Sequence, residues 1–188
     1  KEGKTKGEAH ILAGEQGFFL FHTALKTEKK SRLLFFFPLA FGTKAELQAH
    51  PSFNGLAVEC AYLEKERLLL FEKRIFDEKR PALFLAFAFA DSAPFSYLSR
   101  ADDLPAEEGT TLAKALFSAD FKQTQGPCRR PVAVLKCSFE GEKETDLILA
   151  FGKDREKVLG QIKLLREKAK GQYGRVDDAA KIIDPRKE

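Results

Sequence analysis

A loosely repeated unit constrains the fold of this chain more than any other feature of its sequence. The unit is an apolar run, a charged turn and a second apolar run that contains Leu-Ala-Phe, which stands at residues 39–41, 85–87 and 149–151. Two apolar runs joined by a short charged turn are typical of a β-hairpin, and spaced self-similarity indicates repeated supersecondary units. The sequence therefore predicts three β-hairpins, each leading into a helix.

The first predicted hairpin pairs Phe18–Leu25 with Leu33–Phe41 around a turn at Thr27–Ser31. In this register Phe21 lies opposite Phe37, and the apolar residues of both strands form one continuous face. The register therefore supports the hairpin.

The second predicted hairpin pairs Arg67–Phe76 with Ala82–Ala90 around Asp77–Arg80. One face of Ala82–Ala90 carries leucine and phenylalanine, and the other is mostly alanine. A strand that is apolar on both faces is typical of the centre of a sheet. We therefore expect another element to pack closely over the alanine face.

The third predicted hairpin pairs Pro131–Phe139 with Thr145–Gly152. Asp154 then stands at the N-cap of the strongest helical pattern, Arg155–Lys170. The apolar stripe of this helix comprises Val158, Leu159, Ile162, Leu165 and Ala169.

Shorter elements complete the expected fold. In chain order they are a strand at His10–Ala13, a helix from Thr43 to Ala49, a strand at Leu56–Leu63 (with a helix at Ala57–Glu66 as the alternative), a short helix after Asp91 or Ser92, and a helix at Thr111–Phe117. The rest of Arg100–Gly126 is irregular and is expected to connect units or to form a functional loop.

These elements predict an α+β fold with a mainly antiparallel sheet built from β-hairpins, helices on one face and a long C-terminal helix. We expect a single domain over residues 1–188, with a subdivision into 1–100 and 127–188 as the alternative. The order of strands followed by a long helix is also similar to that of pleckstrin-homology-like modules, in which a helix caps a small barrel. Only the order of elements supports that analogy.

Composition narrows the class of protein and partner. Apolar residues make up 44% of the 188 positions and charged residues 32%, as in globular proteins, and 18 phenylalanines without tryptophan indicate a core packed with phenylalanine. The net charge of +4, from 32 basic and 28 acidic residues, is too small to indicate a nucleic-acid partner.

The expected location is the cytoplasm. No apolar run reaches the roughly 18 to 20 residues of a transmembrane span; the longest, Leu33–Phe41, contains Pro38. Three cysteines form no disulfide framework, which favours a reducing compartment. The sequence contains no methionine, so a removed signal peptide, a truncated chain and omitted methionines all remain open.

The third hairpin predicts an anion-binding site. Antiparallel pairing would place Arg129 and Arg130 beside Lys153 and Arg155, around the N-terminus of the last helix. Unpaired N–H groups at a helix N-terminus favour a phosphate, a carboxylate or an acidic peptide. The simpler interpretation is that Asp154 already satisfies these donors and that the cations are solvated.

Histidines and acidic residues predict no catalytic or metal site. His10, His22 and His50 lie on three separate elements without the spacing of metal ligands, so we expect no metal and no cofactor. The neighbouring Asp102 and Asp103 are interpreted as a solvated pair in a loop.

Two cysteines differ in their expected roles. Cys137 alternates inward with Leu135 and is predicted to lie in the core. Cys128 precedes two arginines, and nearby cations lower the pKa of a thiol. A nucleophilic cysteine also needs an adjacent base, and no sequence neighbour of Cys128 provides one.

The function that these features favour is a non-catalytic binding or scaffolding module that recognises a protein partner or a small anionic ligand. The alternative is an enzyme with dispersed residues, which would require Cys128 or His22 in a cleft and Cys128 within hydrogen-bond reach of a histidine. A third hypothesis is a homo-oligomer formed through an exposed sheet edge or a Phe-rich patch.

Overall fold

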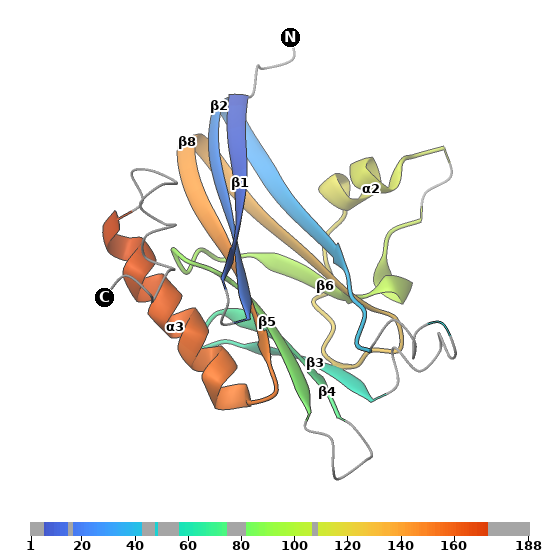
Figure 1. Ribbon diagram of the computed structural model, residues 1–188. Helices are drawn as coiled ribbons and strands as arrows, with labels where there is room; N and C mark the ends of the chain where they lie inside the picture. Colours follow the sequence, from blue (N-terminus) through green and yellow to red (C-terminus); the bar gives the residue numbers. More distant parts are fainter. Residues whose placement is uncertain are drawn as a thin grey trace.

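A computed structural model describes residues 6–14, 17–42, 48, 57–74, 82–106 and 109–172 (Figure 1). The strands are β1 (Lys6–Gly14), β2 (Phe18–Pro38), β3 (Val58–Leu63), β4 (Leu68–Lys73), β5 (Leu83–Phe89), β6 (Ser96–Arg100), β7 (Gly126–Pro127) and β8 (Pro131–Gly152). The helical elements are η2 (Ala101–Asp103), α2 (Leu112–Ser118) and α3 (Arg155–Gln172). No helix among these residues is long and apolar enough to cross a membrane.

The strands form one antiparallel sheet. The order of its strands is β1-β2-β8-β5-β4-β3-β7. β6 is not part of this order and pairs with β8. β8 therefore joins β2, β5 and β6, all of which precede it in the chain. The predicted α+β fold with a mainly antiparallel sheet and a long C-terminal helix is confirmed.

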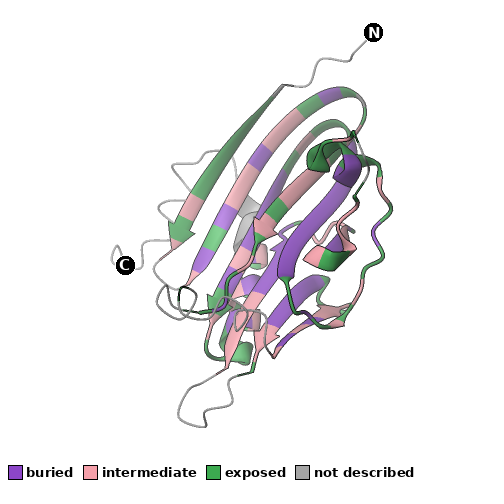
Figure 2. Ribbon diagram, turned by 90° about the vertical axis from the view of Figure 1, so that its right-hand side faces the viewer, coloured by how far each residue is buried: buried purple, intermediate pink, exposed green. Residues whose placement is uncertain are grey.

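β2 and β8 are long strands that bend together. They contain 21 and 22 residues and pair over most of their length, with a register shift between Thr27 and Ser31. The rings of Phe21 and Phe37 lie 5.2 Å apart, although sixteen residues of a straight strand span about 50 Å. The two-stranded ribbon therefore folds back on itself, as Figures 1 and 2 show.

We call this bent ribbon the arch. Its first limb comprises residues 18–27 of β2 and 141–150 of β8, and its second limb comprises residues 31–38 and 132–139. The limbs have different neighbours, because β5 pairs with the first limb of β8 and β6 with the second. Gly141, at the bend, has a φ of +78°, in the left-handed region that favours glycine.

The arch shows that the first and third predicted hairpins are wrong. Each charged segment lies at the bend of its strand. The two apolar runs on either side of it face each other across the core and do not pair with each other through backbone hydrogen bonds. Val134 pairs with Phe36 and Leu98, whereas Ile148 lies on the other limb. Alternating apolar residues suit both arrangements, since either one buries the same face of each strand.

The second predicted hairpin and its packing are confirmed. β4 and β5 pair from Leu68 opposite Ala88 to Lys73 opposite Leu83, and β5 lies between β8 and β4 in the sheet. α3 covers the alanine face of β5. Its side chains at Val158, Ile162 and Leu165 are buried in one cluster with Ala86, Ala88 and Ala90.

Shorter elements agree in part with the predictions. β3 and α2 are confirmed, and Thr111 caps α2 by accepting a hydrogen bond from the Lys114 amide at 3.4 Å. The helix expected after Asp91 or Ser92 is wrong, because Asp91 Oδ1 accepts from the Ala93 amide at 2.9 Å and the chain then enters β6. The predicted Thr43–Ala49 helix falls on residues of which only 48 is described, and the Asp77–Arg80 turn lies outside the described residues.

The main core fills the interior of the arch. Figure 2 shows that burial is concentrated on the strands below the bend. Aromatic packing dominates there, as the composition predicts: the ring of Phe87 lies 5.3 Å from that of Phe37, and Phe89 lies 5.4 Å from Phe95. A smaller cluster, which includes Leu116 of α2, covers the outer face of the second limb.

Residues 123–127 connect β6 to β3. Three side chains of β6 donate to three successive carbonyls: Tyr97 Oη to Gln123 at 3.0 Å, Ser99 Oγ to Thr124 at 2.7 Å, and Arg100 Nη2 to Gln125 at 2.5 Å. β7 then pairs with β3, with Gly126 opposite Cys60. This short segment therefore joins two strands that do not pair with each other.

Candidate functional site

The four cations of the predicted anion site belong to opposite limbs of the arch. Arg129 and Arg130 precede the second limb of β8, and Lys153 and Arg155 follow its first limb. The apolar core, with Leu135 and Leu147 from the two limbs, lies between them. The third hairpin, which would bring the four cations together around the N-terminus of α3, does not form.

Local contacts account for two of these four residues. Arg130 pairs with Asp102 at 3.3 Å, and Arg155 pairs with Glu156 at 3.3 Å. Asp154 Oδ1 accepts a hydrogen bond from the Lys157 amide at 3.2 Å and caps α3, as the simpler interpretation predicts. Anion binding by either pair of cations alone stays a prediction.

A different group of cations surrounds an open groove between β2 and α2. The groove has a volume of about 550 Å³. Its lining residues are Lys30 and Arg32 of β2 and Lys114, Phe117 and Ser118 of α2. We call it the basic groove.

The bend in β2 sets the position of its two cations. Between Thr27 and Ser31 the strand contains two more residues than β8 does opposite, and the hydroxyls of Thr27 and Ser31 lie 2.9 Å apart. Because side chains alternate along a strand, Lys30 and Arg32 lie on the same face as Leu34. Leu34 packs against the cluster under α2, so both cations face that helix.

α2 supplies the opposite wall of the groove. Its buried face consists of Ala115 and Leu116, which leaves Lys114 and Phe117 exposed. Phe117 is 41% exposed and offers an apolar surface beside the cations. The groove therefore combines positive charge with an aromatic ring.

Two cations also hold α2 in place. Arg32 donates from Nη1 to the carbonyl of Phe117, and Lys136 donates from Nζ to the carbonyls of Leu116, at 3.3 Å, and Ala119. Lys136 also lies over the ring of Phe121, 4.0 Å from its centroid. The last carbonyls of a helix have no partner within it and carry partial negative charge, so these contacts stabilise the end of α2.

The groove keeps an excess of positive charge. Burial lowers the pKa of Lys136, the positive charge of Arg32 lowers it further, and Asp120 opposes the shift. Lys30 and Lys114 form no ion pair with any described residue. A phosphate or carboxylate between them would therefore meet two ammonium groups and the guanidinium of Arg32.

A histidine–aspartate pair lies elsewhere, on the first limb. His22 Nδ1 and Asp146 Oδ1 are 2.7 Å apart, and the ring of His10 stacks on His22 at 6.3 Å between centroids. Burial raises the pKa of Asp146, and its hydrogen bond with His22 opposes the shift. The carboxylate orients the imidazole, as in many structural and catalytic pairs.

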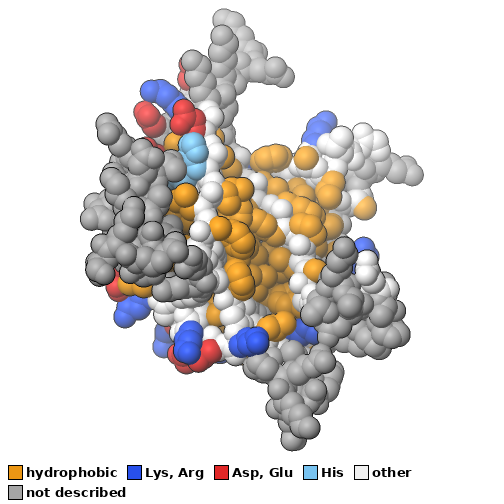
Figure 3. All heavy atoms as spheres, viewed as in Figure 1, with side chains coloured by type: hydrophobic (Ala, Val, Ile, Leu, Met, Phe, Trp, Pro, Cys, Tyr) orange, Lys and Arg blue, Asp and Glu red, His pale blue; other side chains and the backbone are white. Residues whose placement is uncertain are grey.

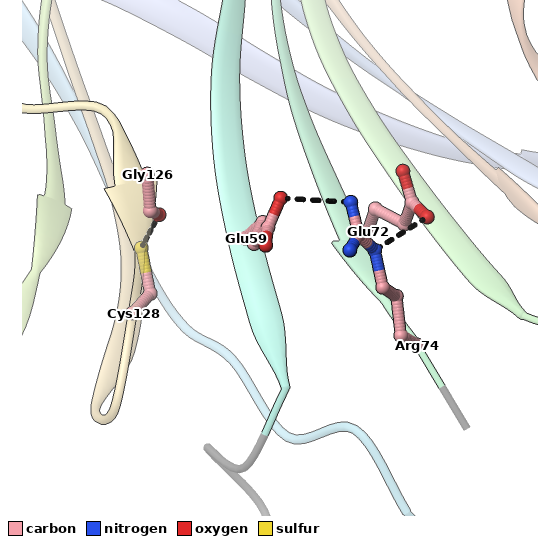
Figure 4. A network of polar contacts seen from close by, with 5 residues as sticks. All are labelled: Glu59, Glu72, Arg74, Gly126 and Cys128. Atoms are coloured by element: carbon pink, nitrogen blue, oxygen red, sulfur yellow. Dashed lines mark hydrogen bonds and ion pairs between the residues drawn. The ribbon is translucent and has the colours of Figure 1, made fainter. Parts of the chain in front are cut away.

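Cys128 does not meet the condition set for the enzyme hypothesis within the described part of the chain. Its sulfur donates to the carbonyl of Gly126 at 3.3 Å (Figure 4). The side chains that lower its pKa are Cys60, Ser99 and Arg100. None of these is a histidine. The same view shows an ion-paired set on β3 and β4, in which Arg74 contacts Glu59 at 3.2 Å and Glu72 at 3.5 Å. His50 lies outside the described residues, and the enzyme hypothesis stays a prediction.

Apolar side chains gather on the open side of the arch (Figure 3). The half-buried residues packed against the main core include Phe21, Leu33, Phe35 and Phe37. Near the end of β8, the rings of Phe19 and Phe151 stack 6.0 Å apart, and these residues are 37% and 42% exposed. The homo-oligomer hypothesis therefore has a defined surface, and it stays a prediction.

No protein-family model and no curated protein matches this chain. The basic groove therefore has to be interpreted from its own chemistry. Sequence reasoning missed it because Arg32 and Phe117 are 85 positions apart. The run of lysines at Lys29 and Lys30 was a signal for one wall, but nothing in the sequence indicated that α2 would cover it.

Proposed function

We propose that the protein is a non-catalytic binding or scaffolding module that recognises an anionic ligand, or an acidic segment of a protein partner, at the basic groove. One observation carries the proposal: Lys30 and Lys114 face the same groove from different elements without an ion pair among the described residues. Arg32 lies in the same groove, and its bond to the end of α2 fixes its position.

The arrangement is suited to binding because β2 and α2 bring their cations to one groove. Clustered positive charges raise the rate of encounter with an anion, and Arg32, which is held by its bond to α2, loses little freedom when the anion binds. A volume of about 550 Å³ is within the range of small-molecule sites, and the open shape also admits an extended acidic peptide. Phe117 adds an apolar contact that favours a ligand with both a charged and an apolar part.

The cellular setting is part of the same proposal. The three cysteines, Cys60, Cys128 and Cys137, are free thiols, which supports a location in the cytoplasm. A nucleic-acid partner is not proposed, because three cations around one groove are few compared with the basic surfaces that track a phosphate backbone.

The test is a calorimetric titration with two probes, inorganic pyrophosphate and a hexaglutamate peptide. The variant is the double substitution Lys30→Ala with Lys114→Ala, which spares Arg32 because that residue also supports α2. Loss of two partly exposed charge contacts at roughly 0.5–1 kcal/mol each should weaken binding by about 5- to 30-fold. Added salt should weaken wild-type binding as well.

The matched control is Lys157→Ala with Lys163→Ala, which removes two exposed lysines from α3. This control should bind both probes as wild type does. If neither probe binds wild type, or if the groove and control variants bind equally well, the proposal is wrong.

A further inference from the structure

Two of the three cysteines form a pair on neighbouring strands. Gly126 of β7 lies opposite Cys60 of β3, and the Cys128 amide donates to the Val58 carbonyl at 2.8 Å. Cys60 and Cys128 are therefore diagonal neighbours on one face of the sheet. The two side chains belong to the same buried cluster, and each thiol shifts the pKa of the other.

The surroundings of this pair give the two thiols different pKa values. The pKa of Cys128 is lowered to about 7, mainly by its interaction with the Cys60 thiol and also by Ser99 and Arg100, against the effect of burial. The pKa of Cys60 is raised, first by its interaction with Cys128 and then by burial. Cys128 therefore loses its proton first, while Cys60 keeps its proton.

Cys137 provides an internal comparison. It lies in the same core on the second limb of β8, and burial raises its pKa. Because the thiolate is the reactive form, Cys137 should react far more slowly than Cys128.

We propose that Cys60 and Cys128 are a hydroperoxide-sensitive pair, which closes to a disulfide that links β3 to β7. The thiolate of Cys128 attacks one oxygen of hydrogen peroxide, the O–O bond breaks, and Cys128 becomes a sulfenic acid as hydroxide leaves and takes up a proton to form water. The sulfur of Cys60 then attacks the sulfur of Cys128, and the sulfenic oxygen leaves with the proton of Cys60 as a second water. The two thiols are oxidised together, and one peroxide is reduced.

The local structure allows both access and closure. The two thiol residues are 2% and 1% exposed, so peroxide needs a local opening. β7 contains only two residues at the end of the sheet order, and the exposed Arg129 and Arg130 follow it. A segment held by so few backbone bonds opens at low free energy, and its freedom also lets the diagonal pair approach to disulfide distance.

The test counts thiols in the intact protein after treatment with hydrogen peroxide. The protein is then denatured in the presence of N-ethylmaleimide, which labels every remaining thiol. The mass of the labelled protein gives the number of thiols. Labelled thiols should fall from three to one, a disulfide-linked peptide should contain Cys60 and Cys128, and dithiothreitol should restore all three. Three labelled thiols after treatment, or a disulfide that involves Cys137, would overturn the proposal.

Serine variants separate the two roles. Cys137→Ser should still form the disulfide at the wild-type rate. Cys60→Ser should leave Cys128 as a sulfenic or sulfinic acid, because the resolving thiol is gone, and Cys128→Ser should lower the rate of thiol loss by at least about tenfold. Equal rates in Cys128→Ser and wild type would refute the assignment of Cys128. If a serine variant does not fold, the peptide map of the wild-type protein still decides whether the disulfide forms.

Discussion

The bend of the arch depends on one glycine, and alanine at that position gives a quantitative test. Gly141 has a φ of +78°, and a methyl group added there would meet no atom within 4 Å. The effect of Gly141→Ala is therefore confined to the backbone. An L-residue in the left-handed region destabilises the folded state by roughly 1–2 kcal/mol. Alanine also restricts the unfolded chain more than glycine does, which offsets about 0.4–1 kcal/mol of this loss. The expected net loss of unfolding free energy is about 0.5–1.5 kcal/mol.

Gly160 is the matched control, because a methyl group there also meets nothing within 4 Å. This glycine is exposed in the middle of α3, where alanine is favoured over glycine by roughly 0.5–1 kcal/mol. The two substitutions are chemically identical and sterically free, yet they should change stability in opposite directions. Gly141→Asn should lie between wild type and Gly141→Ala, since asparagine tolerates the left-handed region better.

Urea unfolding followed by far-ultraviolet circular dichroism measures all three variants, with equal m-values required for the comparison. The reasoning fails if Gly141→Ala is as stable as wild type while Gly160→Ala is stabilised. In that case residue 141 would not need a left-handed conformation, and the bend of β8 would have another cause.

Four further predictions test the packing of α3 on β5, the contacts that hold the end of α2, the pair Cys60 and Cys128, and the exposed phenylalanines. Ala88→Leu should destabilise the protein by about 1–3 kcal/mol because α3 covers Ala88, whereas Ala113→Leu on the exposed face of α2 should change stability little in the same urea assay. Lys136→Met should destabilise by about 1–3 kcal/mol because the end of α2 loses its donor, and Lys163→Met should be nearly neutral. The rate of thiol loss in peroxide should rise with pH and reach half its maximum near the Cys128 pKa of about 7, because only the thiolate reacts; a flat profile would contradict this. If the protein self-associates through its exposed phenylalanines, Phe19→Ser with Phe151→Ser should remove the concentration dependence of its mass in sedimentation equilibrium, and a monomeric wild type would reject the hypothesis.

Local signals in the sequence were sufficient for several elements of the fold. The alanine face of Ala82–Ala90 predicted a central strand with a closely packed neighbour, and α3 is that neighbour. Asp154 predicted the start of α3. Each of these signals depends on residues within one turn or one strand.

The arch was beyond the reach of the same signals. A charged turn between two alternating strands suits a hairpin and a bent strand equally well, because both bury Phe21 and Phe37 on one face. The choice depends on which strand each strand pairs with through backbone hydrogen bonds, and β2 pairs with β8, whose residues are between 94 and 132 positions further along the chain. The predicted grouping of the four cations depended on the third hairpin, which does not form, and the basic groove was missed because its walls also come from distant segments.

The pairing of β2 with β8 has a consequence for synthesis on the ribosome. His22 and Asp146, which meet across these strands, are separated by 124 positions. At about 5–20 residues per second, β2 waits roughly 6–25 s for its partner to be made. During that interval a Phe-rich segment lacks the strand that covers its edge, and chains dominated by such long-range contacts also fold slowly. The nascent protein should therefore be a strong client of chaperones that bind exposed aromatic segments, and its yield should depend on them more than its finished stability suggests.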